Sequence, residues 1–208
     1  MILVTFAVPF ESAAFRRLPV SRTVRILHTG VGADAARVAM ESALGAELPK
    51  RVIASGFAGA LVPELVAGEI VTDATWRFAS ASEVLTTAEA KRAFRARTGA
   101  DIVEMETDAI REVCALAGVP VTALRAISDG ANDDLALPPD LLEALSRHPV
   151  LAAPRLLGTL LTNAARRKSF LRLMRDCRTA QETLAQALAV EIEGAAAQFG
   201  RDDHAARQ

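Results

Sequence analysis

Along its first 130 residues the chain alternates between short apolar runs and longer segments in which apolar residues recur with helical spacing. The short runs are uninterrupted and rich in β-branched residues, which predicts buried strands. These strands are expected at Ile2–Ala7, Val24–Thr29, Val52–Ala54, Gly68–Thr72, Ile102–Met105 and Pro120–Ile127. The helical spacing predicts helices at Phe10–Arg17, Ala33–Leu48, Ala88–Arg97 and Ala109–Ala117. Gly99 and Gly118 are expected to end the last two.

Strands that alternate with helices favour an α/β fold with three layers, in which a largely parallel central sheet is flanked by helices. With 208 residues, the chain is expected to form a single domain over residues 1–208. After Pro138 and Pro139 the pattern is helical, so residues 138–208 are expected to be a helical C-terminal extension. From Phe170 onward, helical spacing predicts one long amphipathic helix. Its apolar residues are Met174, Cys177, Leu184 and Leu188.

Composition narrows the class of protein. Hydrophobic residues make up 51% and the formal net charge is -1, so a large core is available and no overall field favours nucleic acid. The three histidines are scattered and nothing has metal-ligand spacing, so we expect no metal and no other cofactor. Cys114 and Cys177 are expected to be buried free thiols. The apolar start lacks a basic stretch, and no apolar run reaches the ~20 residues of a membrane span, so we expect a cytoplasmic protein.

Residues able to do chemistry follow several of the predicted strands. In open α/β sheets, ligands bind beyond the carboxyl ends of the strands, so these residues are expected to meet there. They are Glu11, Gly30-Val31-Gly32, the predicted turn Gly56–Ala60, Val103-Glu104-Met105-Glu106-Thr107 and Arg125-Ala126-Ile127-Ser128-Asp129.

The acidic residues among them have two interpretations each. Glu104 and Glu106 project to the same side of an extended chain. They suit a ribose diol bound between them, but a solvated edge strand shows the same pattern. Asp129 follows an apolar strand, where it suits either acid catalysis or the chemistry of a turn.

The other candidates are also open. The Gly30-Val31-Gly32 segment suits either a phosphate cradle built from backbone N–H groups or a plain tight turn. Arg125 lies within an apolar strand, and a buried guanidinium needs acidic partners or an anionic ligand. His28 is expected to be a hydrogen-bonded core or loop histidine rather than a catalyst.

In combination, these motifs resemble the nucleoside phosphorylase/nucleosidase superfamily. Most of the resemblance lies in Val103-Glu104-Met105-Glu106-Thr107 and Arg125-Ala126-Ile127-Ser128-Asp129. Glu11, Gly30-Val31-Gly32, Gly56-Phe57-Ala58-Gly59 and Gly68-Glu69-Ile70-Val71 add to it in consistent order. The chain is most similar to the branch that contains methylthioadenosine/S-adenosylhomocysteine nucleosidase. The resemblance implies an enzyme that cleaves the N-glycosidic bond of a purine nucleoside, with adenine as the base.

The resemblance also implies a role for each residue. Asp129 would be the general acid that protonates N7 of the departing purine, which requires a protonated carboxyl near neutral pH. Glu11 would activate the attacking water, and Arg125 would orient it. Glu106 would accept hydrogen bonds from the ribose hydroxyls, and Met105 would pack on the sugar. The site would also include Gly56, Phe57, Glu104 and Ser128, with Gly30 and Gly32 in the loop on the side of the nucleophile.

Two departures from the family pattern qualify this picture. Val52–Ala54 contain no Arg, and Phe57 stands where family members have a Ser near the phosphate or water. Phosphate would be poorly held without a cation, so water is the expected nucleophile and a hydrolase the expected enzyme. In addition, the segment between Thr72 and Glu104 is shorter than in the nucleosidases. The pocket is therefore expected to be more open on one side.

A narrower resemblance lies later in the chain. Glu83–Arg92, Thr98–Asp101 and the terminal helix Phe170–Leu184 are similar to hopanoid-associated members of the superfamily, which are linked to the removal of adenine from adenosylhopane. This resemblance implies a 5′-lipid-linked adenosine as substrate.

The terminal region also carries a basic cluster beside its apolar residues. Such a face can rest on the inner surface of an anionic membrane, although a solvated basic face over a core-packing stripe has the same pattern. The basic residues are Arg166, Arg167, Lys168, Arg172, Arg175 and Arg178.

Three alternative functions fit parts of the pattern. They are a phosphate-dependent nucleoside phosphorylase, a catalytically inactive nucleoside-binding protein, and an interaction module that uses the terminal helix. The joint presence of Glu11, Glu106, Arg125 and Asp129 argues against the last two, because binding alone needs no acid at the leaving group. Members of the superfamily are usually oligomers, so we expect a homodimer that binds a small nucleoside and no nucleic acid.

Overall fold

The computed structural model describes residues 1–19, 23–135, 137, 141, 144 and 149–205. Within these residues, seven strands form one mixed sheet. The strands are β1 (Ile2–Phe6), β2 (Val24–His28), β3 (Arg51–Ala60), β4 (Ile70–Thr72), β5 (Phe78–Ser80), β6 (Ile102–Glu104) and β7 (Val121–Asp129). The helices are η1 (Phe15–Arg17), α1 (Ala33–Ala46), α2 (Ala88–Thr98), α3 (Thr107–Leu116), α5 (Pro149–Thr162) and α6 (Ala164–Ala205). The predicted boundary at Pro138 and Pro139 lies outside the described residues.

The sheet is organised around β3. This strand pairs in parallel with β1 and with β7, and β1 pairs in parallel with β2. Its last two residues, Gly59 and Ala60, pair antiparallel with β6, which has β5 as a parallel neighbour. β4 is an antiparallel partner of β7. The predicted α/β fold with a largely parallel sheet flanked by helices is confirmed, with β4 and β6 as the antiparallel additions.

The predicted turn at Gly56–Ala60 is wrong, because β3 does not end at Ala54. The strand continues to Ala60, and residues 52–59 pair with β7 with a shift in register after Ala58. Gly56 has a φ of 139°, which a residue with a side chain would adopt only with strain. Glycine within this strand therefore permits a close approach of other groups rather than a turn.

The remaining boundaries differ in smaller ways. Of the predicted helix Phe10–Arg17, only Phe15–Arg17 is helical, as one 3-10 turn. β5 has no counterpart among the predicted strands, because its three residues carry too short an apolar pattern. Asp129 is the last residue of β7 rather than part of a following turn. Gly99 follows α2 in the left-handed conformation, as expected for a residue that ends a helix.

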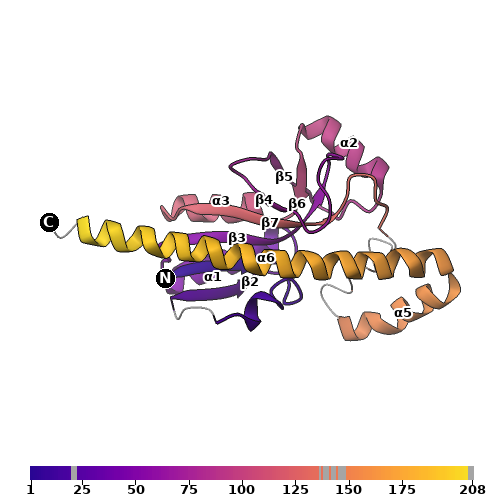
Figure 1. The fold of residues 1–208 in the computed structure, drawn as a ribbon, viewed down its shortest axis with the longest axis horizontal. Helices are drawn as coiled ribbons and strands as arrows, with labels where there is room; N and C mark the ends of the chain where they lie inside the picture. Colours follow the sequence, from indigo (N-terminus) through magenta and orange to yellow (C-terminus); the bar gives the residue numbers. More distant parts are fainter. Residues whose placement is uncertain (20–22, 136, 138–140, 142–143, 145–148, 206–208) are drawn as a thin grey trace.

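Successive side chains of the central strands point to opposite faces of the sheet, and helices cover both faces. On one face, Leu3 of β1 and Val52 of β3 pack against Met40 of α1 and Ile110 of α3. Figure 1 shows α6 running along the opposite face. The predicted three-layer arrangement therefore has α1 and α3 on one side and α6 on the other.

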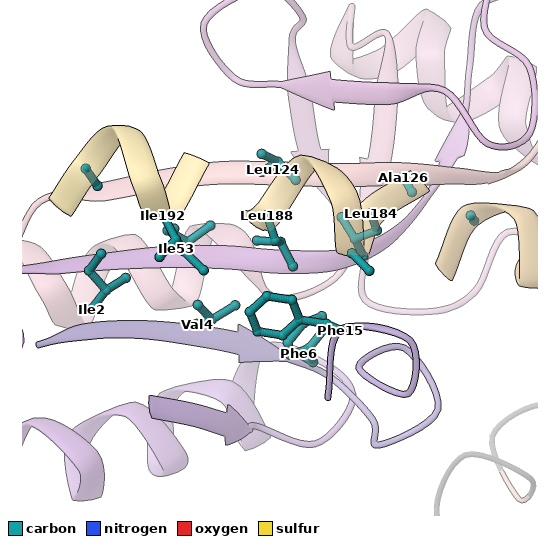
Figure 2. Packing of buried hydrophobic residues seen from close by; sticks show 13 residues of the cluster. Ile2, Val4, Phe6, Phe15, Ile53, Leu124, Ala126, Leu184, Leu188 and Ile192 are labelled. Carbon is teal, nitrogen blue, oxygen red and sulfur yellow. The ribbon is translucent and has the colours of Figure 1, made fainter. Parts of the chain in front are cut away.

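The face under α6 forms the largest apolar cluster. Val4 of β1 and Ile53 of β3 belong to it together with Leu184, Leu188 and Ile192 of α6 (Figure 2). Leu184 and Leu188 are 1% and 0% exposed. Burial of each such side chain stabilises the fold by about 1.5–3 kcal/mol. α6 is therefore held to the sheet by its own apolar stripe.

The helical C-terminal region has two structural parts. α6 is 42 residues long, and residues in its middle, from Ala180 to Ala195, pack against the sheet. α5 lies beside its first half (Figure 1). Phe170 of α6 packs there with Leu156 and Leu160 of α5 in a separate small cluster. The residues expected to form an extension thus supply one layer of the main core and a helical hairpin beyond it.

Candidate active site

A cavity of about 760 Å³ lies near the carboxyl ends of β1 and β7 and beside the far half of β3. Part of its lining is polar, and this part includes most of the residues predicted at the strand ends. The polar residues are Glu11, Glu83, Lys91, Glu104, Glu106, Ser128 and Asp129. The ionisable side chains therefore meet near the carboxyl ends of the strands, where ligands bind in open α/β sheets.

Glu11 is held by backbone N–H groups. Its Oε2 accepts hydrogen bonds from the N–H groups of Ala7 (2.8 Å) and Val8 (3.2 Å), and its Oε1 accepts one from Phe57 (2.8 Å). A Cβ added at Gly56 would lie 2.9 Å from Glu11 Oε1, so only glycine leaves room for the carboxylate. Burial raises the pKa of Glu11 by more than the N–H donors and Arg125 lower it. An oriented carboxylate with a raised pKa is suited to accept a proton from water.

Phe57 bears on the first departure from the family pattern. It contributes to the Glu11 site through its backbone N–H, which any residue would supply. Its ring lines the cavity and packs edge-on against Phe10, with 6.1 Å between the ring centroids. The replacement of a hydroxyl side chain by an aromatic one therefore leaves the hydrogen bond to Glu11 intact and makes the cavity more apolar.

Arg125 is buried behind the cavity wall, with 1% of its surface exposed. Its Nη2 donates to Glu104 Oε2 at 2.6 Å and to the Thr107 hydroxyl at 2.9 Å, and it lies 3.7 Å from Glu106 Oε2. These are the acidic partners that a buried guanidinium requires. Arg125 is also near Glu11. It would therefore orient the attacking water indirectly, by holding the carboxylates that contact this water.

Glu104 is fully engaged within the protein. It accepts hydrogen bonds from the Ser80 hydroxyl, from the N–H groups of Glu106 (2.9 Å) and Thr107 (2.7 Å), and from Arg125. Burial alone would raise the pKa of Glu104, but Arg125 and the hydroxyl donors outweigh it and lower the pKa. Glu104 is therefore a charged group that fixes the start of α3. Arg125, rather than a ligand, offsets its repulsion with Glu106.

Glu106 connects the glycine loop to the cavity. Its Oε1 accepts a hydrogen bond from the Gly32 N–H at 2.9 Å, and Gly30 and Gly32 both have left-handed φ values. Burial raises the pKa of Glu106 to about 7, with Glu11 and Glu104 adding to the rise and Arg125 and Gly32 opposing it. In this structure the loop therefore donates to a side-chain carboxyl group. A group with this pKa exchanges its proton near neutral pH.

Asp129 has two side-chain partners. Its Oδ1 accepts a hydrogen bond from the Ser128 hydroxyl at 2.6 Å, and its Oδ2 accepts one from Lys91 Nζ at 2.5 Å. The carboxyl group borders Gly59, where an added Cβ would lie 3.2 Å from Oδ2. Both partners favour the charged carboxylate. The role implied by the resemblance, however, requires a proton on Asp129.

The rest of the cavity lining is apolar, and the C-terminal helices supply part of it. We expected the shortened segment before Glu104 to leave one side of the pocket open. α5 and α6 contribute lining residues that the family motifs did not indicate. The apolar lining includes Phe10, Val84, Leu85, Leu135, Leu137, Leu156, Phe170, Leu173 and Met174.

The predicted site residues fall into two groups. Those that line the cavity are Glu11, Phe57, Glu104, Met105, Glu106, Ser128 and Asp129. Those that lie behind it are Arg125, Gly56, Gly30 and Gly32. Gly56 makes room for Glu11, and Gly32 donates to Glu106.

Sequence reasoning missed Lys91. It lies on the buried face of α2, three residues before Phe94, and is 1% exposed. A lysine at an apolar position of an amphipathic helix was the available signal. A cation buried at such a position needs a partner inside the protein, and here Asp129 supplies it.

Other residues considered from the sequence lie in ordinary surroundings. His28 Nε2 is 2.8 Å from the Ser12 hydroxyl, and burial lowers the pKa of His28. Cys114 and Cys177 are buried and free, as predicted; burial raises their pKa values to about 11 and about 12. In the described part of the chain, no three metal-ligating side chains gather in one place. No helix among the described residues is long and apolar enough to cross a membrane.

Comparisons with known proteins concern the sequence family and the fold. Residues 74–153 match the family model described as the phosphorylase superfamily. The native structure of futalosine hydrolase from Helicobacter pylori strain 26695 is similar to this chain with a TM-score of 0.66 and 15% identity, over 93% of this chain and 97% of that one. The predicted resemblance to the nucleoside phosphorylase/nucleosidase superfamily is confirmed.

Other structures with the superfamily fold carry ligands. A mutant of the Helicobacter pylori methylthioadenosine nucleosidase, with 5′-methylthioadenosine in its active site, has a TM-score of 0.65 and 15% identity, over 93% of this chain and 98% of that one. The Colwellia psychrerythraea 34H nucleosidase, in complex with adenine, has a TM-score of 0.59 and 14% identity, over 90% and 94%. No curated protein matches the sequence. At these identities the likeness establishes the fold alone, and the ligands are properties of those neighbours.

Proposed function

We propose that this protein is an enzyme that hydrolyses the N-glycosidic bond of a purine nucleoside, with adenine as the base. One observation carries the proposal: two carboxyl groups of one cavity each lie in close contact with a glycine of β3. Glu11 lies against Gly56 and Asp129 against Gly59. Three residues of a strand span ~10 Å. The two carboxyl groups therefore approach β3 at different points along the strand, and the sugar would lie between them with water on one side and the base on the other, as in inverting glycosidases.

Glu11 would act on the side of the water. Its carboxylate is fixed by three backbone N–H groups, so it keeps its orientation while it accepts a proton. The raised pKa of Glu11 makes it a stronger base than an exposed carboxylate. The water that it activates would attack C1′ of the sugar as the bond to the base breaks.

The sugar would lie between Met105 and Glu106, which both line the cavity. Glu106 has one oxygen on the Gly32 N–H. Its other oxygen, 3.7 Å from Arg125 Nη2, would accept hydrogen bonds from the ribose hydroxyls. Asp129 would serve the base by delivering a proton to N7. Adenine bound in the Colwellia neighbour and 5′-methylthioadenosine in the Helicobacter neighbour support this class of substrate.

Water rather than phosphate is the proposed nucleophile. Among the described residues that line the cavity, Lys91 is the only cation, and it is bonded to Asp129. A phosphate dianion beside Glu11 would therefore meet a carboxylate without a cation on the cavity wall to balance it. Arg125 lies behind the wall, where it is occupied by Glu104.

The substrate is further proposed to carry a bulky apolar group at its 5′ position, such as the lipid of adenosylhopane. Support comes from the apolar lining contributed by α5 and α6, including Leu156, Phe170 and Leu173. The polar residues of the cavity suffice for a ribose and a base. The apolar lining provides additional contact surface that a small 5′ substituent would leave unfilled.

Contact with an anionic membrane surface is proposed for the α5–α6 hairpin. Leu151, Leu157, Leu161 and Leu171 are 58–79% exposed on it. Basic residues lie next to them in the sequence, and apolar insertion combined with basic charge is the usual mode of interfacial helices. Because the same two helices line the cavity, a substrate taken from the membrane would have a short path to the site.

The test of the proposed function measures the products. The protein is incubated with adenosine, 5′-methylthioadenosine and a 5′-alkyl-5′-deoxyadenosine, each with and without phosphate. We expect free adenine and free sugar at rates independent of phosphate, with the highest kcat/KM for the 5′-alkyl substrate. A sugar 1-phosphate would favour the phosphorylase alternative. Nucleoside binding without release of base in any reaction would favour an inactive binding protein.

A further inference from the structure

The ion pair between Lys91 and Asp129 is not explained by the proposed mechanism. Lys91 Nζ donates to Asp129 Oδ2 at 2.5 Å, to the Gly130 carbonyl at 2.7 Å and to the Asp133 carbonyl at 3.2 Å. All three of its protons therefore have acceptors. Lys91 is 1% exposed, and both ends of the pair line the cavity. A buried ammonium ion thus lies directly against the carboxyl group assigned to protonate the base.

This arrangement determines where the transferable proton resides. The Asp129 carboxylate accepts hydrogen bonds on both oxygens, from Ser128 and from Lys91. In the Lys91–Asp129 contact the ammonium group is the donor and Oδ2 the acceptor, so the proton that lies between them belongs to Lys91. A carboxylate cannot protonate N7 unless it gains a proton in the same step, and Lys91 is the nearest donor that can give one up.

We propose that Lys91 holds Asp129 in place and supplies, through Asp129, the proton that the departing base takes up. The proposal rests on the proposed function and specifies the origin of the proton at the base end of the site. Lys91 acts through Asp129 and is a positioning residue rather than one that touches the substrate.

The proton movements are as follows. As the C1′–N9 bond breaks, its electron pair passes to the purine ring. Lys91 Nζ passes a proton to Asp129 Oδ2, and the neutral carboxyl group so formed gives this same proton to N7 as the bond breaks. The step leaves a neutral purine, a carboxylate and a neutral amine. At the other end, water adds its hydroxyl to C1′ and its remaining proton passes to Glu11. Glu11 then loses this proton to solvent and Lys91 regains one, so that water alone is consumed.

Several other titratable groups face the pair. The Asp133 carboxylate accepts hydrogen bonds from the Gly130 N–H at 2.8 Å and from Arg172 of α6 at 2.9 Å. Cys177 of α6 lies near Asp129, and its pKa of about 12 keeps the thiol protonated and neutral. Glu83 lines the same cavity, and Asp134 binds the start of α2 through the Ala88 N–H. Glu11 and Glu106 line the same cavity. Lys91 is thus the cationic donor to Asp129 among the described residues.

The experiment compares pH profiles of base release for wild type and Lys91→Met. In the variant, Asp129 must itself hold the proton before the reaction. We therefore expect activity near the wild-type value at low pH. In the alkaline range the ratio of wild-type to variant kcat should grow by about tenfold per pH unit. A purely structural ion pair predicts instead a loss of the same size at every pH, and that result would overturn the proposal.

Lys91→Arg tests the proton directly. Arginine keeps the positive charge and the ion pair but does not release its proton. We expect it to leave alkaline activity as low as in Lys91→Met. Recovery to within about threefold of wild type would contradict a proton-supplying role.

Controls separate folding from chemistry. Lys50→Met makes the same change at an exposed position away from the cavity lining and should leave the profile unaltered. The double variant Lys91→Met with Asp129→Asn removes both charges, and its thermal unfolding shows whether the site still folds. In the Asp129→Asn background, loss of Lys91 should have no further effect on kcat, and an additional pH-dependent loss would count against transfer through Asp129. If wild-type protein releases no base from any adenine nucleoside, the proposed function itself fails and this inference fails with it.

Discussion

Glu106 is expected to affect both the pH dependence of folding and the binding of substrate. Its pKa in the folded protein is about 7, against an ordinary value of 4.5. The folded state therefore favours the protonated form. The contribution of this proton to the free energy of unfolding is fully present below pH 4.5 and is lost as the pH rises through 7.

Glu106→Gln removes this dependence, because glutamine is uncharged at every pH and can still accept the Gly32 hydrogen bond. We expect the free energy of unfolding of wild type to fall by up to about 3 kcal/mol relative to the variant between pH 5 and pH 8. Chemical denaturation across this range measures the difference. Glu64→Gln, at an exposed position, is the matched control and should follow wild type. Parallel curves for wild type and Glu106→Gln would show that Glu106 ionises normally in the fold.

Asp129 is the second residue whose role can be isolated. Asp129→Asn keeps the shape of the side chain but removes the carboxyl group that relays a proton to the base. Turnover should fall by about 10²–10⁴-fold, the usual contribution of a positioned acid. Steady-state release of adenine measures it. Asp34→Asn, whose side chain is fully exposed, should retain full activity. Near-normal turnover of Asp129→Asn would remove this residue from the mechanism.

At the scale of elements, α6 belongs both to the core and to the cavity. Phe170 lines the cavity, whereas its neighbour Leu171 points outward and is 62% exposed. If the apolar lining holds the 5′ substituent, Phe170→Ala should lower kcat/KM for a 5′-alkyl adenosine by about 10- to 200-fold. The value for adenosine itself should change little. Leu171→Ala is the control and should affect neither substrate. An equal loss for both substrates would place the 5′ group elsewhere.

The elements also show how far sequence reasoning reached. Strands such as Ile2–Phe6 were predictable because a buried parallel strand needs an uninterrupted β-branched run. The second half of β3 could not be predicted, because Gly56 and Gly59 are residues typical of a turn. In the structure they lie within the strand and leave room for the carboxylates of Glu11 and Asp129. Most of the polar residues in the family motifs line one cavity in the structure. The motifs assigned no site role to Lys91 or to the lining residues of α6, because helical periodicity predicts a buried face but not which groups pack against it.

At the scale of the whole molecule, the α5–α6 hairpin makes membrane association testable. Vesicles containing phosphatidylserine should bind the protein, and vesicles of phosphatidylcholine alone should bind it much less. Replacing Arg166, Arg167 and Lys168 with glutamine should weaken binding to the anionic vesicles by roughly 100-fold, since each basic residue contributes about 1 kcal/mol. Sedimentation with vesicles measures this. The matched control replaces Arg92, Arg95 and Arg97 of α2, and equal losses in both triple variants would exclude the hairpin as the contact.

The position of α6 in the chain affects how the protein is made. This helix follows all seven strands in sequence, yet it covers the face of the sheet that carries Val4 and Ile53. During translation that face stays uncovered until Leu184 and Leu188 leave the ribosome. A nascent chain that already has every strand therefore still exposes a broad apolar surface, which is the kind of surface that chaperones bind and that drives aggregation. The yield of folded protein should consequently depend on how quickly the ribosome completes the last helix.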